Sequence, residues 1–104
     1  MRIVGAREAR RLNKAFRKKD YATNVLSFPY GSGEGDLILC HPVIAREARK
    51  SGKTLAAHYA HMVVHGLLHL SGYDHEKKRE AKRMEGAEVR LLRRAGFRNP
   101  YTVE

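Results

Sequence analysis

The chain has 104 residues and is strongly basic, with 21 lysine and arginine residues against 11 acidic ones and a formal net charge of +10. This length predicts one small domain, residues 1–104, with a single modest core. The charge favours a polyanionic partner such as nucleic acid. No apolar run approaches the roughly 20 residues that span a bilayer, and the one cysteine, Cys40, excludes an internal disulfide. We therefore expect no membrane partner and a cytoplasmic location.

The chain is predicted to begin with a strand ending at residues 2–4 and a helix over residues 6–19. Ala9, Leu12 and Phe16 recur at the spacing of one helical face, which predicts a narrow buried stripe. The rest of this helix is rich in arginine and lysine. We interpret most of these charges as a solvated face.

A strand pair and a second helix are expected next. Residues 25–28 have the pattern of a short strand that Pro29 ends, residues 30–35 that of a glycine-rich hairpin loop, and residues 36–40 that of the partner strand. Pro42 is well placed to start a helix that stops near residue 52. The inward-facing residues of that helix are predicted to be Val43, Ile44 and Ala48.

The next predicted helix, residues 55–70 with Thr54 as its N-cap, is apolar around nearly its whole circumference, which is typical of a central, buried helix. Its polar exceptions fall within a sector of roughly 80° at 100° per residue. These residues are His58, His61, His65 and His69. A final helix over residues 77–95 is expected to bury Met84, Ala87, Leu91 and Ala95 and to end at Gly96.

Within this sector, His65 and His69 are four residues apart, so their imidazoles can reach one ion from adjacent helical turns. Gly72 then permits a break that brings His75 back toward the same point. Three nitrogen ligands leave a fourth position open, as a hydrolytic zinc enzyme requires. The residues alone leave an alternative open, because His58 and His61 could ligate in place of His75 or could orient ligands or substrate.

The sequence HGLLHLSGYDH over residues 65–75 resembles the signature of the YbeY family of bacterial metallo-endoribonucleases, which take part in ribosomal RNA maturation. Residues 12–29, 35–40 and 84–101 carry further blocks similar to that family, in the same order. Set against the family, the chain is expected to lack the usual first strand and N-terminal helix. The resemblance implies an α+β fold in which a small mixed sheet packs against helices and a central buried helix carries the metal-site histidines.

The resemblance also implies a zinc-dependent, single-strand-specific endoribonuclease that acts in ribosomal RNA processing and ribosome quality control. It assigns one zinc ion to His65, His69 and His75. It places Arg17 in the active-site cleft, where its guanidinium would bind the scissile phosphate and neutralise developing charge, so that Arg17 and His65 are the expected catalytic residues. The expected partners are single-stranded RNA, in particular ribosomal RNA, and the ribosome.

Two other functions are compatible with parts of the pattern. A metal-dependent peptidase or amidohydrolase would use the same three histidines, but Gly66 stands where zinc proteases carry a glutamate general base. A non-catalytic RNA-binding or ribosome-binding module would account for the positive charge alone. No carboxylate is an evident general base in the sequence, so water on the metal or a histidine would have to accept the proton.

Overall fold

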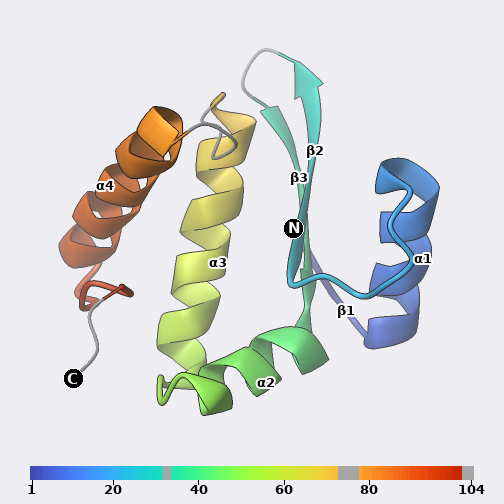
Figure 1. The fold of residues 1–104 in the computed structure, drawn as a ribbon, viewed down its shortest axis with the longest axis horizontal. Coiled ribbons are helices and arrows are strands. Elements are labelled where there is room, and N and C mark those ends of the chain that lie inside the picture. Colours follow the sequence, from blue (N-terminus) through green and yellow to red (C-terminus); the bar gives the residue numbers. More distant parts are fainter. Residues whose placement is uncertain (32–33, 73–77, 102–104) are drawn as a thin grey trace.

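The computed structural model describes residues 1–31, 34–72 and 78–101 (Figure 1). The elements within these ranges follow one another in the order β1 (Arg2–Val4), α1 (Ala6–Arg17), β2 (Val25–Gly31), β3 (Glu34–Cys40), α2 (His41–Lys50), α3 (Leu55–Leu70) and α4 (Lys78–Arg94). Among these residues, no helix is long and apolar enough to cross a membrane.

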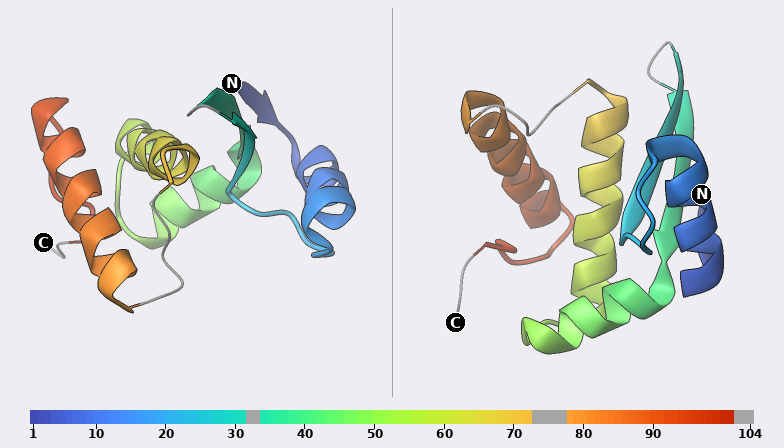
Figure 2. Two further views of the ribbon diagram at one scale, coloured as in Figure 1. Left: turned by 90° about the horizontal axis from the view of Figure 1, so that it is seen from above. Right: turned by 45° about the vertical axis from the view of Figure 1, so that its right-hand side comes forward.

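The three described strands form a mixed sheet with the order β1-β3-β2, in which β1 runs parallel and β2 antiparallel to β3. Helix α1 covers one face of this sheet and α3 covers the other, with α4 on the far side of α3 (Figures 1 and 2). Helix α2 crosses the end of the sheet where β3 finishes. The expected α+β class, with a small mixed sheet against helices, is confirmed.

Alternation along β2 and β3 supplies the core on both faces of the sheet. Leu26 and Ile38 pack with Ala9 on the α1 side. Leu39, with Val25 beside it, packs instead against Met62 and other residues on the α3 side. Helix α3 therefore packs directly on the sheet, and this packing fixes the position of its histidines relative to the strands.

Strand β2 is longer than the sequence predicted, because it continues through Pro29 to Gly31. Proline lacks the N–H that a central strand needs, but among the described strands β2 pairs only with β3, so the missing donor faces no partner strand. The pairing becomes irregular between Pro29 and Gly31. The expected loop over residues 30–35 is thus partly strand, and residues 32 and 33 lie outside the described ranges.

The predicted stripe on α1 is wrong at Phe16, which is 67% exposed, whereas Asn13 is 1% exposed. Asn13 is buried because its side-chain amide donates a hydrogen bond to the Tyr21 carbonyl at 2.9 Å and so ties the following segment to the helix. Phe16 packs edge-on against the Phe28 ring, with centroids 5.3 Å apart, at the margin of the sheet.

On α4 the predicted buried face is correct at Met84 and Ala87, which pack with Leu68 of α3. It is wrong at Leu91, which is 42% exposed, and at Ala95, which is also exposed. Leu92 and Glu88 are buried instead. The burial of Glu88 brings a carboxylate to the histidines of α3.

Helix α3 has the predicted bounds, and the Thr54 hydroxyl caps it by accepting a hydrogen bond from the Ala57 backbone N–H at 3.1 Å. Its burial is less complete than expected, because Leu67 is 49% exposed. Gly66 allows the close approach to the sheet: a Cβ there would lie 2.6 Å from Leu37 Cδ2. The Ser27 hydroxyl donates to the Gly66 carbonyl at 3.2 Å and holds α3 to β2.

Candidate metal centre

Four histidines form a continuous row along α3. The ring centroids of His58 and His61 are 6.0 Å apart, those of His61 and His65 are 6.3 Å apart, and those of His65 and His69 are 4.7 Å apart. The common sector that the helical spacing predicted is therefore present as a row of neighbouring rings. Each ring has a different set of partners, and these partners separate the roles that the four residues can have.

The Nε2 atoms of His65 and His69 lie 3.2 Å apart. Two nitrogens that bind the same tetrahedral zinc ion, each at about 2.1 Å, are separated by about 3.3 Å. The two imidazoles thus already have the spacing of ligands to a single ion, and neutral imidazole nitrogen is a donor that zinc prefers. The third expected ligand, His75, and its neighbour Asp74 lie outside the described residues.

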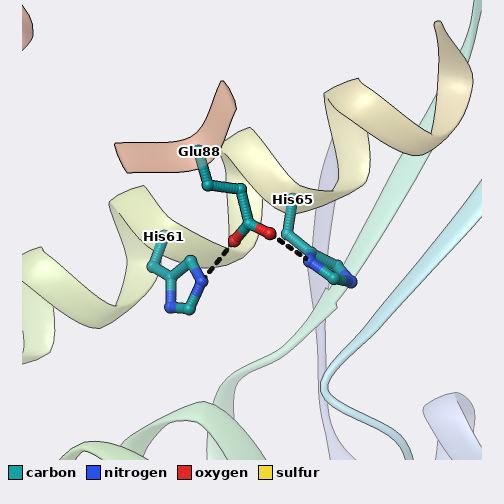
Figure 3. A group of neighbouring side chains, drawn as sticks. All are labelled: His61, His65 and Glu88. Atoms are coloured by element: carbon teal, nitrogen blue, oxygen red, sulfur yellow. Dashed lines mark hydrogen bonds and ion pairs between the residues drawn. The ribbon is translucent and has the colours of Figure 1, made fainter. Parts of the chain in front are cut away.

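Glu88 of α4 is the centre of the hydrogen bonding around this row, and it is 1% exposed. Its Oε2 atom accepts hydrogen bonds from His61 Nε2 at 2.5 Å and from the Tyr101 hydroxyl at 2.9 Å. Its Oε1 atom lies 3.4 Å from His65 Nδ1. Figure 3 shows the carboxylate between the two rings, with one oxygen turned to each.

Electrostatics keep this carboxylate ionised. Burial of Glu88 opposes ionisation, but hydrogen bonds from His61, His65 and Tyr101 outweigh it and lower the pKa of Glu88 to about 2. Burial, together with the adjacent Glu88 charge, raises the pKa of the Tyr101 hydroxyl above its ordinary value, so this hydroxyl stays a donor. An acid this strong is a poor proton acceptor, and Glu88 is therefore unsuited to be the general base that the sequence also lacks.

His61, His65 and Glu88 themselves offer three ligand atoms within 4.8 Å of one another, so this group could hold a cation. Two features favour hydrogen bonding instead. The 2.5 Å between His61 Nε2 and Glu88 Oε2 is a hydrogen-bond length, shorter than the roughly 3.3 Å between ligands of one zinc ion. The group also uses Nδ1 of His65, whereas the pair with His69 uses Nε2, on the other side of the same ring.

His58 is held by a separate carboxylate. Its Nε2 atom lies 3.0 Å from Glu47 Oε1, and the Asn24 amide donates to the same carboxylate at 3.2 and 3.3 Å. Within the described part of the chain, the Nδ1 atoms of His58 and His61 are buried without a hydrogen-bond partner. Nε2 of each upstream histidine therefore interacts with a glutamate. We interpret both residues as buried, hydrogen-bonded side chains.

Arg17 is the last residue of α1 and is exposed. Helix α1, which carries Arg17, lies on the opposite face of the sheet from α3, which carries the histidine row (Figure 1). The C-terminal ends of α1 and α3 nevertheless lie at the same, upper end of the molecule in this view. The role of Arg17 stays a prediction.

Sequence reasoning missed Glu88 as a site residue. The available signal was a charged residue one helical turn after Met84, inside the apolar stripe of α4. A carboxylate in such a position is expected to have a polar partner, because an unpaired buried charge is costly. The partners, however, lie on α3 and after α4, and helical spacing alone does not identify them.

These features define an α+β protein with a candidate metal centre on its central helix. The family model described as Endoribonuclease YbeY matches residues 1–96. A protein of that name from Aromatoleum aromaticum is 57% identical over 97% of this chain and 68% of its own length. Another, from Bordetella pertussis, is 55% identical over the same shares. The solution structure of a Thermotoga maritima protein has a TM-score of 0.57 and 27% identity, covering 96% of this chain and 75% of that one.

The chain belongs to the YbeY family, as the motif at residues 65–75 predicted. The name of the family is that of an RNA-cleaving hydrolase, so the expectation of an enzyme is confirmed at the level of the family.

Proposed function

We propose that this chain is a zinc-dependent, single-strand-specific endoribonuclease that hydrolyses RNA phosphodiester bonds in ribosomal RNA processing and ribosome quality control. The observation that carries the proposal is the 3.2 Å separation of the His65 and His69 Nε2 atoms, in a chain of the YbeY family. The peptidase alternative has less support, because Gly66 cannot act as a base and the nearest buried carboxylate, Glu88, is engaged by hydrogen bonds.

The proposed ligands of one zinc ion are His65, His69 and His75. When bound, zinc supplies a Lewis acid for a phosphoryl oxygen and lowers the pKa of a coordinated water to about 7. The chain supplies the rest. His65 and His69 are held on a helix that is capped at Thr54 and seated on the sheet at Gly66, so their rings are oriented before substrate arrives.

Arg17 is the proposed substrate-binding and catalytic arginine. A guanidinium can donate two parallel hydrogen bonds to a phosphate and stays protonated, so it can stabilise charge that develops at phosphorus. Its support is the resemblance of residues 12–29 to the family, together with the common direction in which α1 and α3 end (Figure 1).

The proposed partners are ribosomal RNA and the ribosome, in the cytoplasm. The net charge of +10 supports a polyanionic partner, because binding to RNA releases counterions and becomes weaker as salt is added. The support for a single-stranded substrate is the resemblance of residues 65–75 to the family signature.

Elemental analysis of the purified chain, combined with a ribonuclease assay, tests the proposal. We expect about one zinc per chain and cleavage of a single-stranded RNA that stops on chelation and returns when zinc is restored. A duplex of the same sequence is the matched substrate and should be cut much less. RNA binding without cleavage in the zinc-loaded protein would favour the non-catalytic module, and peptide turnover without RNA cleavage would favour the peptidase.

A further inference from the structure

We propose that Glu88 is a positioning residue: its carboxylate holds His65 in the tautomer that carries hydrogen on Nδ1, so that the Nε2 lone pair faces His69 and can bind a cation. The inference rests on the proposed function, since it concerns how His65 becomes a ligand. It assigns to Glu88 neither contact with substrate nor transfer of a proton.

Glu88 Oε1 lies 3.4 Å from His65 Nδ1. A carboxylate can only accept hydrogen bonds, so the nitrogen that faces it is favoured as N–H. A neutral imidazole carries one hydrogen, and its other nitrogen then bears the lone pair. For His65 that other nitrogen is Nε2, the atom 3.2 Å from His69 Nε2.

Hydrogen bonds to its other oxygen prevent the Glu88 carboxylate from turning away from His65. Its Oε2 atom is held by His61 Nε2 at 2.5 Å and by the Tyr101 hydroxyl at 2.9 Å. These donors come from α3 and from the segment after α4, so the carboxylate is fixed from two sides. Oε1 is thereby left pointing at His65, as Figure 3 shows.

His61 has a supporting role in this arrangement. Because the same carboxylate accepts from His61 Nε2, that nitrogen carries hydrogen and has no lone pair for a cation beside His65. His61 thus supports Glu88, which in turn orients His65. His61 and Glu88 together orient His65, and the proposed metal centre lies on the Nε2 side of the His65 ring.

The substitution Glu88→Gln gives a direct test, because it keeps the shape but changes one acceptor oxygen into an NH2 donor. The amide oxygen is expected to remain with the two donors, His61 and Tyr101. The amide NH2 then faces His65 Nδ1 and favours a lone pair there, with hydrogen on Nε2. The variant therefore prefers the tautomer that cannot bind a cation through Nε2.

Two measurements follow on the full chain. Nitrogen-15 NMR of the metal-free protein should show His65 with hydrogen on Nδ1 in the wild type and a shift toward hydrogen on Nε2 in Glu88→Gln. Competition with a chelator should show zinc binding weakened by about 10- to 100-fold in the variant. Glu85→Gln is the matched control, because Glu85 is an exposed glutamate on the same helix and its replacement changes the net charge equally.

Cobalt substitution adds a readout that general destabilisation does not change. The visible spectrum of bound cobalt should differ in Glu88→Gln and stay that of the wild type in Glu85→Gln. Should Glu88→Gln fail to fold, Glu88→Asp replaces it, because that variant keeps an acceptor but withdraws it by about 1.5 Å. It should show a smaller shift of the tautomer and of zinc affinity in the same direction.

An unchanged His65 tautomer in a folded Glu88 variant, or zinc affinity equal to that of Glu85→Gln, would overturn the positioning role. The two proposals fail separately. A wild-type chain that binds no zinc overturns the proposed function, yet its metal-free NMR spectra still decide whether Glu88 sets the tautomer. A zinc-binding nuclease in which Glu88→Gln behaves as wild type overturns only the role of Glu88.

Discussion

The two ring nitrogens of His65 have different neighbours: Nε2 lies 3.2 Å from His69 Nε2, and Nδ1 lies 3.4 Å from the buried carboxylate of Glu88. One imidazole thus joins the proposed ligand pair to a hydrogen-bonded support on α4. Helix α3 supplies the rings, while α4 and Tyr101 supply the groups that orient them.

Replacing a proposed ligand should remove the metal. His69→Gln is expected to reduce zinc affinity by more than the roughly 10- to 100-fold that loss of a supporting residue costs, and to abolish RNA cleavage. His41→Gln makes the same change on the exposed start of α2, outside the row, and should retain both properties. Zinc content by elemental analysis and cleavage of a single-stranded RNA are the measurements. Full zinc occupancy in His69→Gln would remove His69 from the site.

Reversing the charge of Arg17 should separate metal binding from chemistry. Arg17→Glu is expected to abolish cleavage and leave zinc content intact, because the guanidinium is assigned to the phosphate. Arg7→Glu changes an exposed position on the same helix and lowers the net charge equally. It should reduce RNA cleavage far less than Arg17→Glu does, and it should leave the zinc content unchanged. Cleavage rates at saturating RNA decide between a local and a general electrostatic effect. Nuclease activity retained in Arg17→Glu would exclude Arg17 from the mechanism.

Gly66→Ala should destabilise the fold even though alanine favours helices over glycine by about 1 kcal/mol. The added Cβ would lie 2.6 Å from Leu37 Cδ2 and 3.3 Å from Val25 Cγ2, so the buried Leu37 side chain or the helix itself must shift. Overpacking of this kind costs about 1–3 kcal/mol. Gly86→Ala on α4 is the matched control, since its Cβ would meet only the flexible Arg90 side chain at 3.4 Å. Equal unfolding free energies for the two variants in urea would contradict the close approach.

Acid should reveal the contribution of Glu88 to the stability of the metal-free protein. Its pKa is lowered from 4.5 to about 2, so the ionised form stabilises the folded state above pH 4.5, and this contribution is lost progressively as the pH falls toward 2. The unfolding free energy of the wild type minus that of Glu88→Gln should therefore shrink over this range. Chemical denaturation at several pH values measures this difference, and a difference independent of pH would show that Glu88 is not stabilised as an anion.

Local signals in the sequence were enough to predict several of the helices and their buried faces. Thr54 caps α3 and its apolar residues run to Leu70, so the bounds of that helix were correctly predicted, as were the inward residues of α2. The motif at residues 65–75 correctly predicted the family. In each case the determining interactions lie within a few residues of one another.

The errors arose where distant segments decide burial. Asn13 replaces Phe16 in the core because of a carbonyl eight residues further along the chain. Glu88 is buried because His61, His65 and Tyr101 lie around it, and these residues are 27, 23 and 13 positions away. Periodicity favours apolar residues for the interior and cannot identify a polar residue whose partners come from other elements.

The Glu88 carboxylate also makes α4 part of the centre. This carboxylate joins two rings of α3 to the Tyr101 hydroxyl. Any change that loosens the packing between Met84 and Leu68 would therefore alter the position of His65, although neither residue contacts the ring through this cluster. On the proposed function, metal occupancy and the docking of the last helix should be thermodynamically linked, and each should protect the other against unfolding and proteolysis.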